Sequence, residues 1–326
     1  MVNIMRLRYQ LALFILASSA ITSSALGQTR AFPNKPIRML VGYEPGGPND
    51  TQARLIGPKI AESLEQQVIV ENRPGGDGVI AGEMVAKSAP DGHTMILISA
   101  GHSIMPNFIK IPYHPLHDFS PIAQVSSSPY FLVVHPSLPV QSTQALIQYA
   151  KSKPGELNYG SSGTAGALMM AMELFNGMNG LKINHIPYKG AAPATADLIA
   201  GRIQVMMNNA VSSLPNARAG KLRVLAVTSP SRSPATPDIP ALSESVPGYS
   251  AESWYGVLAA HATPAPIVNR LNAAIVRALT LPDIRERFSA LGLQPVGGTS
   301  EQWTALIQNE LLKWAKLVKE NGITAN

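Results

Sequence analysis

The segment of residues 37–50, IRMLVGYEPGGPND, constrains the fold more than any other part of the chain. The apolar run Ile37–Val41 is typical of a buried strand, and a turn containing Gly46 and Gly47 follows it. Asp50 then stands where a helix would begin, because its carboxylate can cap free backbone N–H groups. A helix start presents bare N–H groups and the positive end of its dipole, and both favour anions. We therefore expect a strand–turn–helix unit with an anion-binding nest.

The rest of the chain alternates short apolar runs with segments of helical spacing, which predicts an α/β fold built on a parallel, doubly wound sheet. We expect strands at 37–41, 68–70, 95–99, 131–135, 157–160, 182–187, 205–208, 224–228 and 254–259. We expect helices at 51–64, 79–86, 143–152, 165–176, 193–200, 266–280, 282–290 and 300–321. Residues 229–240 are rich in Pro and Ser and predict a surface loop.

A second strand–turn–helix unit is expected around Tyr159-Gly160-Ser161-Ser162-Gly163-Thr164, whose hydroxyls could donate to a carboxylate. The alternative is a serine hydrolase with Ser162 as nucleophile. Its G-x-S-x-G spacing is not met, because Gly163 follows Ser162 directly, and the sequence places no His or acid partner. Two such nests favour two lobes that face one cleft. We expect residues 28–128 and 252–326 in one lobe and 129–251 in the other, with crossings near 128–131 and 250–254.

The N-terminus reads as a cleavable signal peptide, residues 1–27. Arg6 and Arg8 precede an apolar stretch at 11–20, and small residues follow, so Gln28 would be the first mature residue. An uncleaved anchor helix is the alternative, although the stretch is short for a membrane span. The product would then be exported to the periplasm.

Composition excludes several classes of function. The formal net charge of +6 is spread without a basic run, which argues against nucleic-acid binding. The chain has no cysteine, so thiol nucleophiles and cysteine metal sites are excluded. Apolar residues make up 45% of the chain, enough for a sizeable core.

Two weaker motifs have simpler interpretations. Gly76-Asp77-Gly78-Val79-Ile80-Ala81 matches G-x-G-x-x-A, but it does not directly follow a strand, which favours a structural loop over a dinucleotide site. His114 and His117 have metal-like spacing, but Pro115 breaks any helix between them and no third ligand is clustered nearby.

Polar residues at strand ends are further candidates for the cleft. Ser99 and Ala100 lie at the end of the predicted third strand, and Asn208 and Asn209 lie at the end of a later one and could offer amide hydrogen bonds. Ligands of open α/β sheets bind at the carboxyl ends of the strands, so these residues could line the site.

Six blocks of this sequence resemble, in order, the periplasmic solute-binding receptors of tripartite tricarboxylate transporters, the Bug/TctC type. They are PNKPIRMLVGYEPGGPND, VIVENRPGGDG, APDGHTMIL, HDFSPIAQV, INHIPYKGAAPATADLIAGRIQVM and AGKLRVLAVTS. The resemblance implies a two-lobed periplasmic-binding-protein fold (type II-like, a Venus flytrap) with two interlobe crossover strands. It also implies a receptor without catalysis or cofactor, which closes on a small organic carboxylate.

The resemblance also implies which residues bind. The first loop would contribute Tyr43, Gly46, Gly47, Pro48 and Asp50, the second Ser161, Ser162, Gly163 and Thr164, and the remaining wall Ser99, Ala100, Tyr188, Lys189 and Asn208. The sequence departs from the family pattern at Gly166, Met169 and Asn208, which leaves the identity of the carboxylate open. The expected partner is a membrane permease, with a membrane sensor as the alternative. The expected state is a monomer that binds no nucleic acid and no metal.

Overall fold

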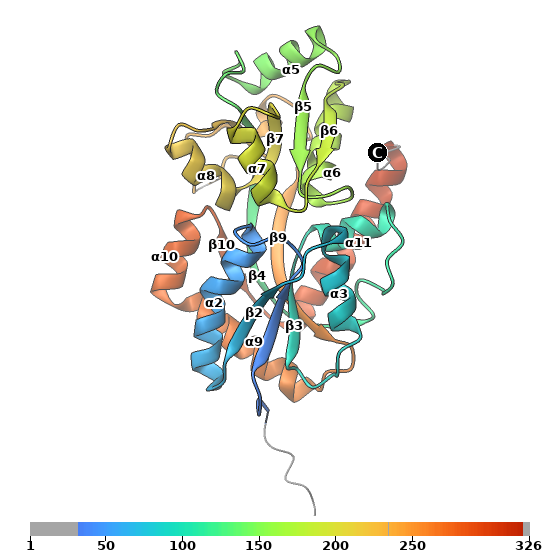
Figure 1. The fold of residues 1–326 in the computed structure, drawn as a ribbon, viewed down its shortest axis with the longest axis vertical. Helices are drawn as coiled ribbons and strands as arrows, with labels where there is room; N and C mark the ends of the chain where they lie inside the picture. The colour runs from blue at the N-terminus through green and yellow to red at the C-terminus, as the bar shows by residue number, and fades with distance from the viewer. Residues whose placement is uncertain (1–31, 234, 322–326) are drawn as a thin grey trace, which may run out of the picture. The chain divides into compact units, whose positions relative to one another are not determined.

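The computed structural model describes residues 32–233 and 235–321 (Figure 1). The chain forms two units, Met1–Asn34 and Lys35–Asn326, and the fold below is that of the described part of the second unit. The predicted signal peptide, residues 1–27, lies outside the described residues. Within the part that the structure describes, no helix is long and apolar enough to cross a membrane.

The described part contains ten strands in one mixed sheet. They are β1 Ile37–Val41, β2 Val68–Asn72, β3 Thr94–Ser99, β4 Phe119–Val134, β5 Asn158–Ser161, β6 Asn184–Pro187, β7 Val205–Asn209, β8 Arg223–Val227, β9 Glu252–Ala260 and β10 Gln294–Gly297. Their order is β2-β1-β3-β9-β4-β7-β5-β6, and β8 and β10 each pair with β4. The nine predicted strands are confirmed, while β10 was not predicted and β4 begins at Phe119, well before the expected 131.

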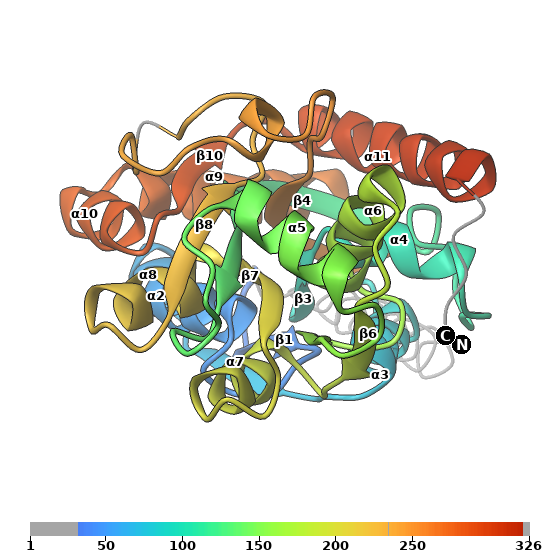
Figure 2. The same ribbon diagram turned by 90° about the horizontal axis from the view of Figure 1, so that it is seen from above.

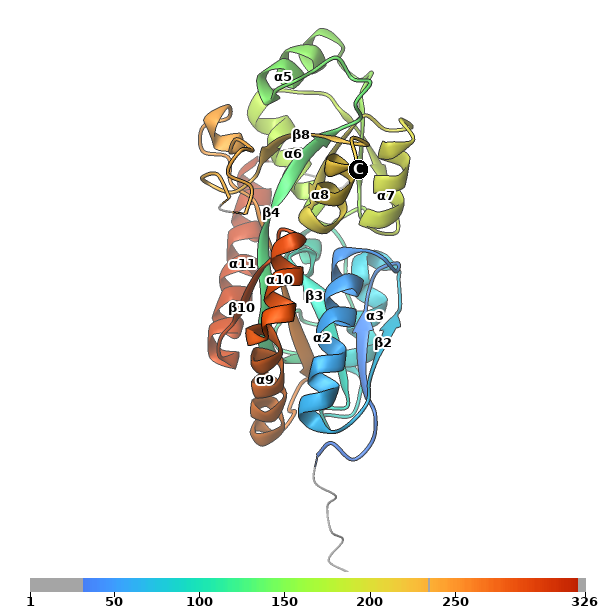
Figure 3. The same ribbon diagram turned by 90° about the vertical axis from the view of Figure 1, so that its left-hand side faces the viewer.

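The helices are α2 Pro48–Leu64, α3 Val79–Ala86, α4 Gly101–Ile104, α5 Thr143–Ser152, α6 Ala167–Asn179, α7 Ala191–Ile199, α8 Ala210–Arg218, α9 Ala265–Thr280, α10 Pro282–Ala290 and α11 Ser300–Asn321. Short 3-10 turns lie at Gly76–Gly78, Met105–Asn107 and Leu242–Glu244. The helices α9, α10 and α11 lie together next to β4, on the opposite side of the molecule from α3 (Figures 2 and 3). The helices α4 and α8 were not predicted from the sequence. The structure confirms the other eight predicted helices, whose ends shift by at most a few residues.

The prediction of a wholly parallel sheet is wrong. β1 is parallel to β2 and β3, and β5 is parallel to β6 and β7. However, β9 is antiparallel to both β3 and β4, and β4 is antiparallel to β7, β8 and β10. The reason is topological: the chain leaves the first group of parallel strands along β4 and returns along β9 in the opposite direction.

The strand β4 belongs to both groups of strands. Its residues 119–129 pair with β9, whereas residues 130–134 pair with β7. Figure 3 shows β4 running the length of this arrangement. At the point where β4 changes partners, the backbone N–H of Tyr130 donates to Oγ1 of the buried Thr228 at 2.7 Å, and that hydroxyl donates to the Ala251 carbonyl at 2.5 Å. A single side chain therefore ties β4 to the segment that leads into β9.

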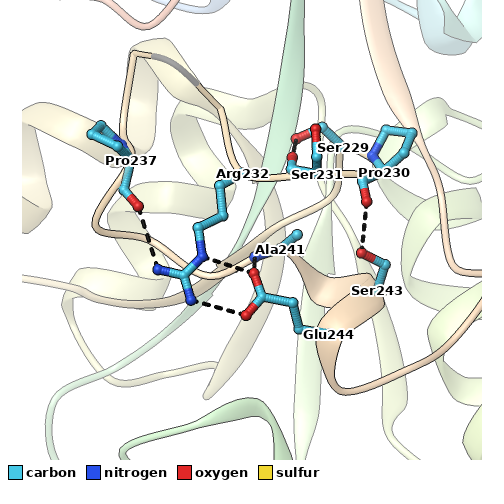
Figure 4. A network of polar contacts seen from close by, with 8 residues as sticks. All are labelled: Ser229, Pro230, Ser231, Arg232, Pro237, Ala241, Ser243 and Glu244. Carbon is cyan, nitrogen blue, oxygen red and sulfur yellow. Dashed lines mark hydrogen bonds and ion pairs between the residues drawn. The ribbon is translucent and has the colours of Figure 1, made fainter.

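The predicted surface loop after β8 is held by a polar network (Figure 4). Arg232 donates to both carboxylate oxygens of Glu244, at 2.8 and 2.9 Å, and Glu244 also accepts from the Ala241 N–H. Ser243 donates to the Pro230 carbonyl at 2.9 Å. These contacts join residues 230–232 to residues 237–244, within the part of this loop that the structure describes.

Candidate functional site

Several helices begin around one small cavity. Each of α2, α6, α7 and α8 contributes its N-cap residue or its first residues to the wall. The lining residues are Tyr43, Gly47, Pro48, Asn49, Ser99, Tyr130, Ser162, Ala167, Leu168, Ala191, Asn209, Ser253 and Tyr255. The cavity volume is about 40 Å³, which gives room for about three water molecules. None of these lining residues carries a formal charge at neutral pH. The cavity is therefore a neutral space whose field comes from helix N-termini.

The turn before α2 is built by its own sequence. Gly46 adopts φ +82°, a conformation that glycine permits, and its N–H donates to Asp50 Oδ2 at 3.0 Å. Asp50 Oδ1 accepts from Arg54 Nε at 2.9 Å. Burial opposes the ionisation of Asp50, but the hydrogen bonds from Arg54 and Gly46 outweigh it and lower the pKa of Asp50. The carboxylate of Asp50 is thus used within the turn, and Asp50 does not line the cavity.

Hydroxyl groups form the rest of the inner wall. The Tyr43 hydroxyl donates to the Asp77 carbonyl at 3.0 Å, and the hydroxyl-bearing residues Ser99, Tyr130, Ser253 and Tyr255 line the same cavity. Burial raises the pKa of Tyr255 to about 12, so its hydroxyl keeps its proton at neutral pH. Hydroxyls that keep their protons can donate to an anion, and so can the backbone N–H groups of the helix starts.

A carboxylate from another part of the chain, that of Asp77, lies against the loop between β5 and α6. The buried Asp77, from the 3-10 turn after β2, accepts a hydrogen bond from the Ala165 N–H at 2.9 Å. A Cβ atom on Gly163 would lie only 1.5 Å from Asp77 Oδ1, so this contact requires glycine there. The second predicted anion nest therefore contains a carboxylate of the protein itself.

A second, larger hollow adjoins the cavity. Its volume is about 720 Å³, and it is lined by Gly42, Tyr43, Glu44, Pro45, Gly75, Gly76, Asp77, Ser162, Gly163, Thr164, Pro187, Tyr188, Lys189 and Pro193. Tyr43 and Ser162 line both spaces, so they form the wall that the two spaces share. We call the two spaces the inner cavity and the outer hollow.

The structure separates the residues predicted for the site into three groups. The inner cavity takes Tyr43, Gly47, Pro48, Ser99 and Ser162, and the outer hollow adds Gly163, Thr164, Tyr188 and Lys189. The remaining predicted residues, Gly46, Asp50, Ala100, Ser161 and Asn208, line neither space.

Two of the remaining polar residues shape the site from behind. Asn208 is fully buried, and its Oδ1 accepts from the backbone and side-chain amides of Asn209, which orients that lining residue. Ser161 is also fully buried and donates to the Gly163 carbonyl at 2.6 Å, which fixes the shape of the loop. In the outer hollow, the Tyr188 hydroxyl donates to Asp197 at 2.9 Å.

Asn209, a candidate from the sequence beside Asn208, lines the inner cavity. The sequence prediction missed seven lining residues: Asn49, Tyr130, Ala167, Leu168, Ala191, Ser253 and Tyr255. Two signals pointed to them. Some follow the predicted turns by one or two residues at a helix start, and others lie on or beside the two predicted crossings near 128–131 and 250–254. Neither signal was extended to individual side chains.

The weaker motifs have structural roles. For the serine hydrolase alternative, a histidine beside Ser162 would be needed. The histidine nearby, His185 of β6, contacts Ser161 instead: its Nε2 lies 2.6 Å from Oγ of that buried serine. His114 Nδ1 accepts from the N–H groups of Leu116 and His117 within a turn. Among the described residues, no group of three or more His, Asp or Glu is placed to hold a metal ion.

Comparison with known proteins assigns the family. The model of the tripartite tricarboxylate transporter family receptor, TctC, matches residues 52–323. This chain belongs to that family. Protein BugT of Bordetella pertussis is 37% identical to this TctC receptor over 327 residues, which cover 98% of each chain. Members of the family are solute-binding receptors of the periplasm, not enzymes.

Solved structures share the fold of this TctC receptor. "R. palustris Rpa4515 with adipate" is 35% identical, with a TM-score of 0.87 over 90% of this chain and 99% of that chain. MatC (Rpa3494) from Rhodopseudomonas palustris, with bound malate, is 32% identical, with a TM-score of 0.84 over 88% of this chain and 100% of that chain. The predicted two-lobed periplasmic-binding-protein fold is confirmed.

Proposed function

We propose that this receptor binds a small organic carboxylate in the inner cavity and delivers it to a permease of the tripartite tricarboxylate type. The convergence of helix N-termini on an uncharged cavity carries the proposal. A carboxylate there would gain from each dipole, worth about 0.3–1 kcal/mol apiece. It would also accept charge-assisted hydrogen bonds worth about 1.5–3 kcal/mol each. After the costs of association, a free energy of about −8 kcal/mol, or micromolar affinity, is reasonable.

The relatives support the same class of ligand. Rpa4515 contains adipate and MatC contains malate, and both are small carboxylates. We expect the cleft to widen to admit a ligand and to close around it, as two-lobed receptors do. We place the lobes at 28–128 with 252–326 and at 129–251. The closing motion would then bend β4 and β9 near Tyr130 and Ala251.

The remaining parts of the proposal concern export and delivery. Residues 1–27 would direct the chain to the periplasm and be removed, and the mature receptor would act as a monomer. A membrane sensor is the alternative partner. The receptor role also predicts that the chain does not turn over its ligand.

A binding experiment with a matched pair of variants tests the site. The mature protein is unfolded, dialysed free of ligand, refolded and titrated by calorimetry with a panel of carboxylates and their amides. We expect at least one carboxylate to bind and its amide not to bind. Ser162→Asp places a charge at the wall of the inner cavity and should weaken binding at least tenfold, because two charges about 6 Å apart repel by about 3 kcal/mol at an effective dielectric constant of about 20.

The control lies in the same loop. Thr164→Asp adds the same charge at an exposed position of the outer hollow, where water screens it, so the affinity should change little. If no carboxylate binds, the proposed function is wrong. Equal effects of the two substitutions would place the ligand elsewhere.

A further inference from the structure

The carboxylate of Asp77 occupies the outer side of the α6 nest. Asp77 belongs to the turn Gly76–Gly78, whereas the nest precedes α6, so 88 residues separate Asp77 from its hydrogen-bond donor Ala165. The side chain is 9% exposed, and its Oδ1 has no hydrogen-bond partner. The backbone of Asp77 adopts φ +56°, which is uncommon for a residue with a side chain. The fold therefore accepts both an unfavourable backbone conformation and a buried acid to hold this group in the nest.

The inner and outer parts of the nest have different occupants. Ser162, Ala167 and Leu168 face the inner cavity, where the proposed ligand carboxylate would lie. The Ala165 N–H group points to Asp77 instead. We place the rest of the ligand in the outer hollow, because Tyr43 and Ser162 line both spaces. The backbone N–H group of Ala165, which could bind an anion at this end of the ligand, already donates to the carboxylate of Asp77.

Asp77 also brings charge to the outer hollow. Burial, only partly offset by the Ala165 and Thr164 N–H groups, raises the pKa of Asp77 to about 6, so its carboxyl is ionised at about pH 7.5. Glu44, which is half-buried, adds a second acid, while Lys189 is exposed to solvent. Charges buried at low dielectric act more strongly than solvated ones. A second carboxylate arriving here would meet net repulsion.

We infer that Asp77 takes the place of a ligand's second carboxylate, so that this receptor selects monocarboxylates over dicarboxylates. The inference rests on the proposed function and narrows its ligand class. The far end of the ligand would be apolar, because the unpartnered Oδ1 of Asp77 is buried against Gly163 and is not exposed to the outer hollow. Relatives of known structure contain dicarboxylates, so the selectivity of this chain would differ from theirs.

Matched pairs of acids test the inference at about pH 7.5. Hexanoate and adipate have equal chain lengths, as do butyrate and succinate, and each pair differs only in the second carboxylate. Calorimetry gives the ratio of the two dissociation constants for the wild type, Asp77→Asn and Asp77→Gly. The wild type should bind the monocarboxylate of a pair at least tenfold more tightly. Asp77→Gly frees the nest and suits the positive φ, so its preference should fall at least tenfold.

The other variants separate charge from occupancy. Asp77→Asn keeps an acceptor in the nest without the charge, so its preference should fall between those of the wild type and Asp77→Gly. Glu44→Gln removes the other acid of the same hollow and should change the ratio less than threefold.

Two results overturn the inference and leave the proposed function standing. One is a wild type that binds adipate or succinate as tightly as its monocarboxylate partner. The other is a ratio that neither Asp77 substitution changes by more than threefold. If none of these proteins binds either member of a pair, the inference is overturned; if the wider panel also gives no carboxylate that binds, the proposed function is overturned with it.

Discussion

Replacing Asp77 with Asn should stabilise the fold at neutral pH and have almost no effect in acid. The pKa of this buried carboxyl rises from its ordinary value of 3.8 to about 6, because burial penalises the charged form more than the Ala165 and Thr164 N–H groups stabilise it. A shift of about two pKa units corresponds to about 3 kcal/mol. Because the folded-state pKa is the higher one, the favourable contribution is complete below about pH 3.8 and is lost as the pH rises through about 6.

Asparagine has nearly the same shape, tolerates the left-handed backbone and can accept the same N–H bond, but it does not titrate. The difference in unfolding free energy between Asp77→Asn and the wild type should therefore grow from near zero at about pH 4 to about 2–3 kcal/mol at about pH 7.5. Urea unfolding followed by tryptophan fluorescence, at steps between these two pH values, measures the difference.

The control for this experiment is an exposed acid. Lys59 hydrogen-bonds to Asp283 and lowers its pKa. Asp283→Asn should therefore give a small difference of the opposite sign, with the variant becoming relatively less stable as the pH rises. A flat difference curve for Asp77→Asn, or one that falls toward neutral pH, would refute the assignment of Asp77 as a buried, uncompensated charge.

Two further substitutions probe the nest and the crossover. Gly163→Ala should lower the unfolding free energy measured in urea, since its Cβ would lie 1.5 Å from Asp77 Oδ1; Gly177→Ala, in the same helix unit with open space around it, should instead stabilise by about 0.5–1 kcal/mol. The reverse order of these two stabilities would contradict the packing described for the loop. Thr228→Val should cost about 1–3 kcal/mol, because the buried Tyr130 N–H loses its acceptor. An unchanged urea midpoint would show that this tie between β4 and β9 contributes nothing.

Local pattern was enough to predict most of the elements. The run Ile37–Val41 and the helix Thr143–Ser152 match the structure at both ends, because a continuous apolar run marks the strand and the N-cap Ser142 marks the start of the helix. The long β4 was harder to predict. Its first half, 119–130, contains prolines and serines that favour a loop, and pairing with β9 overrides that preference.

The candidate site shows the same division between local and tertiary information. The turn before α2 was predictable, because Gly46 and Asp50 close it through their own hydrogen bond. Which helix starts share a cavity depends on the order of strands in the sheet, and the antiparallel β4 and β9 could not be inferred from strand–helix alternation. The role of Asp77 was not predictable either, since its donor Ala165 comes from a distant segment and the motif around Asp77 indicated only a loop.

In the proposed site, a ligand would meet main-chain amides at helix starts and hydroxyl groups, because no lysine or arginine lines the inner cavity. Apart from proline, no amino-acid replacement removes a main-chain N–H. Drift in the surrounding side chains can therefore reshape the space and change which molecule fits, yet the preference for negative charge persists as long as the helices keep their places. A receptor with such a site can change its ligand specificity by point mutation while it still binds anions.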